Sequence, residues 1–135
     1  QVKMIEKLGI SRSIKVLPFI DREVLAAVYR RAALVLQPSE SEGFGLPVVE
    51  AMACGAPVVA SDLAVLKEVG GEAARFCPVG DVEAWRKAVV GSLCERADYP
   101  DKWGERKAAG INQAARFSWA EYARKMVGLY SEILQ

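Results

Sequence analysis

Short apolar runs alternate with longer amphipathic stretches along this chain, and this alternation restricts the possible folds most. The short runs cover residues 14–17, 33–36, 58–61 and 75–77. Their length and apolar character are typical of strands buried in a sheet. Strands that alternate with helices predict a parallel sheet with right-handed crossovers and helices packed against it, an α/β fold.

Helix boundaries between the runs can be predicted from capping residues. Asp21 is expected to cap one helix, and Ser118 with Glu121 forms a capping-box pattern ahead of the last one. Gly55 is suited to the position just after a helix over residues 47–54. Further helices are expected over residues 2–8, 63–69, from 81 onward and over 101–115, so that the C-terminal part of the chain is helical.

Charge and composition exclude several kinds of site. The formal net charge is +1, so no global basic field is available to hold nucleic acid or an anionic membrane. The chain has no histidine, which removes Ser-His and Cys-His pairs and zinc sites that use histidine. Its three cysteines are an odd number far apart, so we expect reduced thiols in the cytoplasm and no disulfide framework. We expect no metal site and no cofactor.

The longest apolar stretch, residues 43–60, does not predict a membrane span. It contains Glu50, Gly55 and two prolines. No signal peptide is recognisable, and the chain opens on Gln1 within a predicted helix. We therefore expect residues 1–135 to be a single, partial domain of a longer protein.

The segment over residues 38–55 carries the chemistry. It follows a predicted strand and opens a helix, and in open α/β sheets ligands bind beyond the carboxyl ends of the strands. Gly43 and Gly45 allow the backbone to turn tightly and to approach a ligand. Pro47 suits the first helical position. The free N–H groups around residues 45–49 would then attract a diphosphate to the helix N-terminus.

Two carboxylates flank this turn. Glu50 lies among apolar residues, on a helix that we expect to be buried, and helical side chains lean toward the N-terminus. It would therefore point toward the loop, where ribose hydroxyls could satisfy it. Glu42 is free to face the other end of the ligand.

Each of these features has a structural alternative. The glycines could mark an ordinary loop, Glu42 could be solvated, and Phe44 could serve packing. Glu50 could accept hydrogen bonds from the backbone or from an arginine such as Arg75. Together, in this order after a strand, the residues favour a ligand site.

The stretch Glu42-Gly-Phe-Gly-Leu-Pro-Val-Val-Glu50 resembles the Glu-x7-Glu signature of retaining GT-B glycosyltransferases of the group 1 family. The following Ala-Met-Ala-Cys-Gly-Ala-Pro-Val-Val-Ala-Ser-Asp is similar to the next strand of that family. Phe117-Ser118-Trp119, ahead of a terminal helix, is similar to its ending. The resemblance covers nearly the whole chain. It implies a Rossmann-like parallel sheet flanked by helices, part of the C-terminal, nucleotide-sugar-binding domain of a GT-B fold.

The resemblance also implies roles for individual residues. Glu42 would be the catalytic acidic residue that orients the donor sugar. The diphosphate and the sugar would be held by Gly43, Phe44, Gly45 and Leu46. Glu50 would bind the ribose hydroxyls, and Phe19 and Ile20 would lie near the base. The loop before Asp21 lacks the glycine that is usual there.

In this family an N-terminal acceptor domain completes the active site, and an Arg and a Lys from an earlier strand and helix neutralise the leaving diphosphate. Neither that domain nor that pair is recognisable in this chain. An incomplete sheet should leave an exposed edge, through which a homodimer could form. The acceptor domain could also associate with a membrane in the full-length protein.

The sequence therefore predicts the donor-binding part of a hexosyltransferase, inactive alone, that moves a sugar from a nucleoside diphosphate sugar to an acceptor with retention. Two alternatives stay open. One is a related GT-B enzyme, such as a sucrose or starch synthase-like protein. The other is a non-catalytic nucleotide-binding or interaction module. The base, the sugar and the acceptor are not specified by the sequence.

Overall fold

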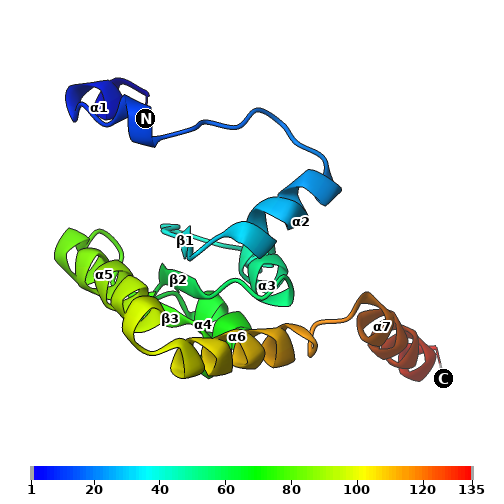
Figure 1. The fold of residues 1–135 in the computed structure, drawn as a ribbon. Helices are drawn as coiled ribbons and strands as arrows, with labels where there is room; N and C mark the ends of the chain where they lie inside the picture. The colour runs from blue at the N-terminus through cyan, green and yellow to red at the C-terminus, as the bar shows by residue number, and fades with distance from the viewer. Residues whose placement is uncertain (1, 135) are drawn as a thin grey trace.

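The computed structural model describes residues 2–134 and contains one three-stranded parallel sheet. The strands are β1 (Val35–Gln37), β2 (Val58–Ser61) and β3 (Arg75–Cys77), in the order β1-β2-β3 (Figure 1). The bounds of β2 and β3 are those predicted from the apolar runs. The predicted α/β fold is therefore confirmed.

Among residues 2–134, seven helices and two short 3-10 turns accompany the sheet along the chain. They are α1 (Val2–Lys7), α2 (Arg22–Arg31), α3 (Leu46–Ala53), α4 (Ala64–Gly70), α5 (Val82–Asp98), α6 (Pro100–Ala114) and α7 (Trp119–Ile133), with short 3-10 turns η1 (Ser11–Ser13) and η2 (Gly71–Ala73).

Two predicted N-caps are confirmed. Asp21 accepts a hydrogen bond from the amide of Val24 at 2.8 Å, and Ser118 accepts one from Glu121 at 3.4 Å.

The main core lies between the sheet and helices α3, α4 and α6. Val58 and Ala60 of β2 face this layer, where they pack with Met52 of α3 and Leu66 of α4. Each of these four residues is at most 2% exposed. The two faces of a sheet are lined by alternate residues, so Val59 points to the opposite side and is also fully buried.

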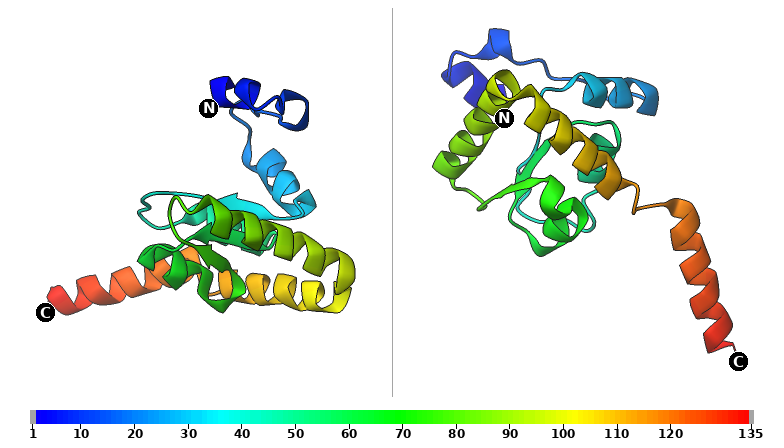
Figure 2. Two further views of the ribbon diagram at one scale, coloured as in Figure 1. Left: turned by 90° about the vertical axis from the view of Figure 1, so that its left-hand side faces the viewer. Right: turned by 60° about the horizontal axis from the view of Figure 1, so that its bottom comes forward.

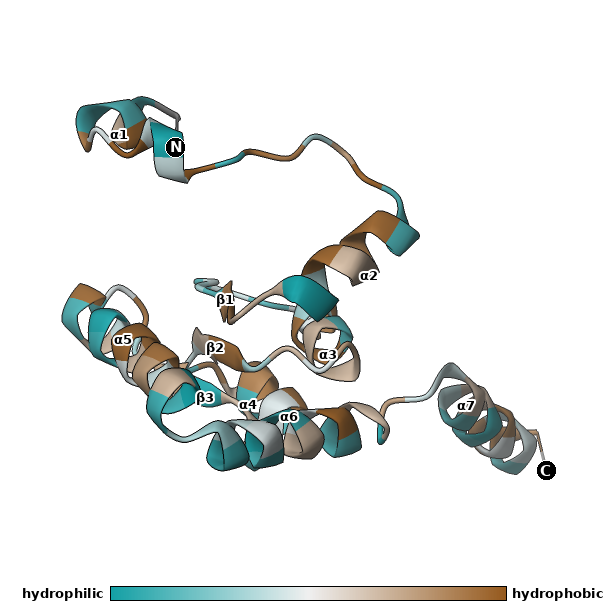
Figure 3. Cartoon of the chain, viewed as in Figure 1, coloured by the Kyte–Doolittle hydropathy of each residue, from teal (hydrophilic) through white to brown (hydrophobic). Residues whose placement is uncertain are grey.

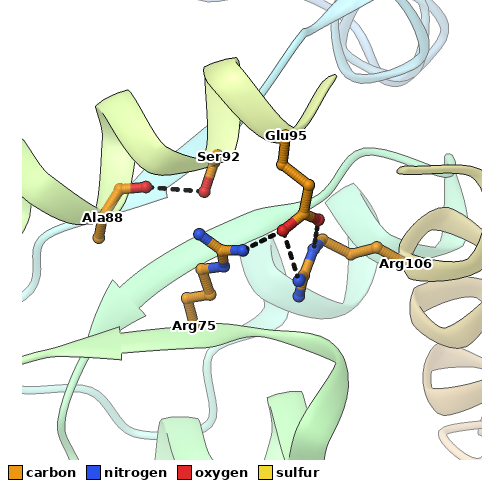
Figure 4. Close-up of polar contacts among 5 residues, drawn as sticks. All are labelled: Arg75, Ala88, Ser92, Glu95 and Arg106. Carbon is orange, nitrogen blue, oxygen red and sulfur yellow. Dashed lines mark hydrogen bonds and ion pairs between the residues drawn. The ribbon is translucent and has the colours of Figure 1, made fainter. Parts of the chain in front are cut away.

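Helix α5 covers that opposite side at β3. A cluster of charged groups joins α5 to β3 and to α6 (Figure 4). Glu95 of α5 accepts a hydrogen bond from Arg75 of β3. It also accepts a bidentate pair of hydrogen bonds from Arg106 of α6, at 2.7 and 3.2 Å. The hydrogen bonds from Arg106, aided by the charge of Arg75, lower the pKa of the Glu95 carboxyl. The cluster therefore holds three elements together through one carboxylate.

The predicted strand over residues 14–17 is wrong. These residues form no strand and are exposed, with Val16 at 71%. Figure 1 shows them in an open segment that runs from α1 toward α2, away from β1. An apolar run becomes a strand only when a neighbouring strand accepts its backbone hydrogen bonds, and no such neighbour is present in the described residues.

The strand predicted over residues 33–36 begins later and is less buried than expected. It is β1, in which Leu36 is 45% exposed. Leu36 shares a sheet face with Val59 and Arg75, and α5 covers that face at β3. Leu36 is exposed because no helix of the described chain covers this face of the sheet at β1.

Both ends of the described chain lie away from the sheet. Helix α7 points away from the end of α6, and α1 lies beyond the open segment (Figures 1 and 2). Apolar residues recur on these parts in Figure 3, and none of those at positions 3–20 and 119–134 is buried. Among residues 2–134, no helix is both long and apolar enough to cross a membrane.

Candidate functional site

The loop over residues 38–45 lies beyond the carboxyl end of β1 and leads directly into α3. Gly45 is the N-cap of that helix, in the left-handed conformation with φ 86° and ψ 37°. A Cβ atom on Gly45 would lie 2.5 Å from Cδ2 of Leu66, a core residue of α4. Glycine is thus required here both by the backbone conformation and by the close approach of α4.

The N-terminus of α3 offers fewer free amides than predicted. The helix begins at Leu46, so Pro47 takes its second position, and the amide of Val48 donates to the carbonyl of Gly45 at 2.9 Å. Within residues 2–134, the amides of Gly45 and Leu46 have no hydrogen-bond acceptor. Both amides lie at the positive end of the helix dipole, where Leu46 is exposed and Gly45 is buried.

Glu42 forms a polar cluster with residues at the end of β1. Its Oε1 accepts hydrogen bonds from Nε2 of Gln37 and from Oγ of Ser39, both at 2.6 Å. The hydrogen bond from Ser39, followed by that from Gln37, lowers the pKa of the Glu42 carboxyl. The arrangement favours an ionised carboxylate beside the glycine turn.

Helix α3 is buried on one side, as predicted, through Val48, Ala51 and Met52, but Glu50 itself lies on the exposed side. It follows Leu46 by four residues and therefore lies on the same face of α3, one turn further on. Its charge contributes, after burial, to raising the pKa of the Tyr29 hydroxyl on α2. The suggested pairing with Arg75 is wrong, because Arg75 binds Glu95.

Phe44 packs against a distant part of the chain. Its ring meets that of Phe117 edge to face, with centroids 5.8 Å apart, and Phe117 itself packs against the core. Phe117 immediately precedes Ser118, the N-cap of α7. Phe44 thus takes part in packing, and the residue remains 46% exposed.

The two residues predicted near a nucleotide base belong to the segment just before α2. Phe19 and Ile20 precede the N-cap of α2, and Phe19 is 100% exposed. A fully exposed side chain makes no contact with the loop over residues 38–45. The structure thus brings Glu42, Gly43, Phe44, Gly45, Leu46 and Glu50 to one helix start and leaves Phe19 apart.

Other parts of the described surface offer little that competes with this loop. No three Asp, Glu or Cys side chains among residues 2–134 lie in a group that could hold a metal ion. Two shallow hollows lie along α6 near η2, lined by residues that include Glu72, Arg106 and Gln113. Neither contains any predicted site residue.

Sequence reasoning missed the residues that support the two carboxylates. Gln37 and Ser39 bind Glu42, and Tyr29 lies near the charge of Glu50. The sequence did contain a signal for Gln37 and Ser39, because these two polar residues follow an apolar run and precede Glu42 by a few positions. Nothing local could have indicated Tyr29 or Phe117, which reach the site only through folding.

Comparison with known proteins shows one family over most of the chain. Residues 2–109 match the model for "Glycosyl transferases group 1". The chain is 38% identical over 136 residues to the serotype-specific mannosyltransferase WbdA of Escherichia coli, covering 99% of this chain and 16% of that protein. It is 37% identical over 140 residues to the D-inositol 3-phosphate glycosyltransferase of Mycolicibacterium smegmatis, covering 98% and 30% respectively. This chain therefore spans less than a third of these relatives.

A solved structure shows the same fold. Sucrose-phosphate synthase from Thermosynechococcus elongatus matches with a TM-score of 0.87 at 29% identity, over 98% of this chain and 33% of that one. The sheet, the flanking helices and the helical C-terminal end are those of the corresponding part of a GT-B protein. With the Glu-Gly-Phe-Gly-Leu-Pro turn placed between β1 and α3, the chain belongs to the group 1 family of glycosyltransferases.

Proposed function

We propose that this chain is the donor-binding part of a retaining glycosyltransferase, which moves a hexose from a nucleoside diphosphate sugar to an acceptor. One observation carries the proposal: the glycine turn between β1 and α3 presents two unpaired amides, with Glu42 before them and Glu50 one helical turn after them. The amides suit a diphosphate, and the carboxylates suit hydroxyl groups on either side of it. The names of the mannosyltransferase relatives favour a hexose.

Each residue has a distinct role in this proposal. Glu50 accepts hydrogen bonds from ribose hydroxyls, and its exposure in the ligand-free chain means that it need not break a protein contact first. Glu42 orients the sugar. The amides of Gly45 and Leu46 stabilise the diphosphate as negative charge develops on it during departure, which is an electrostatic contribution.

We further propose that an acceptor domain elsewhere in the protein completes the site, so that this chain alone binds the donor without transferring it. Helix α7 supports this proposal, since its Tyr122, Leu129, Tyr130 and Ile133 are all more than half exposed. Contiguous apolar residues left uncovered mark an interaction surface. We expect α7 to contact the acceptor domain.

Calorimetric titration with UDP, GDP and ADP, and with their hexose conjugates, tests the donor site. We expect saturable binding of one nucleotide, weakened about tenfold or more by Glu50→Ala because a charge-assisted hydrogen bond is lost. Glu68→Ala is the matched control, since Glu68 is an exposed helical glutamate on α4. Equal weakening by both substitutions, or no binding by the folded chain at millimolar nucleotide, would contradict the proposal.

A further inference from the structure

The polar cluster of Gln37, Ser39 and Glu42 forms a closed triangle of hydrogen bonds. Nε2 of Gln37 lies 2.9 Å from Oγ of Ser39, and each of these atoms lies 2.6 Å from Oε1 of Glu42. Nε2 of Gln37 donates to both Ser39 and Glu42, and the hydroxyl of Ser39 donates to Glu42. Oε1 of Glu42 is therefore the common acceptor of the triangle.

The triangle links a loop carboxylate to the sheet. Gln37 is the last residue of β1 and pairs in register with the buried Ala60 of β2. Glu42 belongs to neither a helix nor a strand. Without Gln37 and Ser39, its long side chain would sample several rotamers over an open loop, so the two donors fix its position relative to the sheet.

The two oxygens of Glu42 differ in what they contact. Oε1 accepts both hydrogen bonds, whereas Oε2 has no partner among residues 2–134. An ionised carboxylate with one anchored oxygen and one open oxygen is preorganised to accept a hydrogen bond from a hydroxyl group.

We propose that Gln37 and Ser39 are positioning residues, which hold Oε1 of Glu42 at the end of β1 and leave Oε2 to accept a hydroxyl hydrogen bond from the donor sugar. The inference rests on the proposed donor site. It adds that discrimination between the sugar-bearing donor and the bare nucleoside diphosphate depends on two side chains that do not contact the ligand.

The test compares how strongly the chain prefers the nucleotide sugar over the same nucleoside diphosphate, measured by calorimetry at several pH values. Gln37→Leu and Ser39→Ala should each reduce that preference roughly five- to tenfold, the effect of about one hydrogen bond, with the affinity for the diphosphate alone unchanged. Ser39→Thr retains the hydroxyl and should restore the preference. Ser41→Ala is the matched control, because Ser41 is an exposed serine of the same loop without a hydrogen bond to Glu42.

The pH dependence separates positioning from a general structural effect. The triangle lowers the pKa of Glu42, so the wild-type preference should persist to a lower pH than that of Ser39→Ala. Carbon-13 NMR titration of the Glu42 carboxyl, without ligand, should show that its pKa is higher in Ser39→Ala and in Gln37→Leu than in the wild type. Thermal unfolding should verify that both variants are folded.

The positioning role of Gln37 and Ser39 and the donor site itself can be contradicted separately. An unchanged sugar preference, or an unchanged pKa of Glu42, in folded Gln37→Leu and Ser39→Ala would overturn the positioning role while nucleotide binding stands. Absence of nucleotide binding by the wild-type chain would overturn the donor site, and the sugar-positioning role with it.

Discussion

Helices α3 and α7 both have an apolar side, but they differ in how far that side is buried. In α3, eight residues include the buried Val48, Ala51 and Met52, and the helix packs against α2, α4, α6 and the sheet. In α7, 15 residues have a pronounced apolar side, yet none is buried. The same contrast separates the middle of the chain from its ends, because every buried residue among 3–134 lies between Gly45 and Ala114.

The comparison teaches that an apolar side predicts burial only where a partner is available. Helix α3 is held from both ends, by β1 before it and β2 after it, so its connections alone bring it against the sheet. Within residues 2–134, helix α7 is joined to the packed middle through the segment at Phe117, and none of its residues is buried. The following experiments challenge this division between a packed middle and open ends.

The largest effect is expected in the packed middle. Leu66→Ala should lower the free energy of unfolding by about 2–5 kcal/mol, because Leu66 is fully buried and the substitution leaves a cavity beside Gly45. Leu129→Ala in α7, where Leu129 is 53% exposed, should change it by less than about 0.5 kcal/mol. Urea unfolding measures both, and similar losses in the two variants would break the comparison.

At the boundary between core and site, Gly45→Ala should cost about 1–3 kcal/mol of stability. The substitution forces a Cβ into the left-handed region and against Leu66. Gly43→Ala is the matched control, with open space around its Cβ and no positive φ. Thermal unfolding distinguishes them; a control as destabilised as Gly45→Ala would show that the whole loop, not this position, is sensitive.

Glu95→Gln should destabilise the chain by about 1–2 kcal/mol at pH 7, since one carboxylate joins Arg75 and Arg106. The pKa of Glu95 is lowered from its ordinary value of 4.5, so the wild-type advantage is present above that pH and is lost as pH falls through the folded-state pKa. Urea titrations at pH 7 and pH 3 should show the gap closing. Glu105→Gln, an exposed glutamate on α6, should show no gap at either pH.

The smallest effect tests the connection between the middle and the C-terminal end. A double-mutant cycle with Phe44→Ala and Phe117→Ala should give a coupling of about 0.5–1.5 kcal/mol, the usual contribution of an edge-to-face aromatic pair. Tyr122 and Trp119, whose rings are 6.1 Å apart within α7, provide a comparison pair away from the loop. Strictly additive losses for Phe44 and Phe117 would mean that the loop and the start of α7 are independent.

Much of the fold could be predicted because its signals are local. Asp21 and Ser118 accept hydrogen bonds from amides three residues ahead, a contact that depends only on the first turn of the helix. Gly55, with φ 75°, follows α3 as predicted. The apolar runs at β2 and β3 lie between turn residues, and both strands have paired neighbours.

The errors came from contacts between distant residues. Residues 14–17 have the apolar character of a strand but no neighbour, and Glu50 is exposed because α3 turns that side outward. For Glu42, the sequence indicated the residue, whereas its hydrogen-bonded orientation required the end of β1 to be in place. The roles of Glu42 and Glu50 toward a ligand stay predictions.

By itself the sequence determined the α/β class, the helix caps, the glycine turn and the family, since all of these depend on the identity and spacing of neighbouring residues. Tertiary structure alone decided which apolar sides are buried, which strand has a partner, and that Phe117 meets Phe44 while Gln37 and Ser39 hold Glu42. The physical reason is the distance along the chain over which each interaction acts. Capping and turn preferences act within a few residues, whereas burial and strand pairing depend on surfaces brought together from elsewhere in the chain.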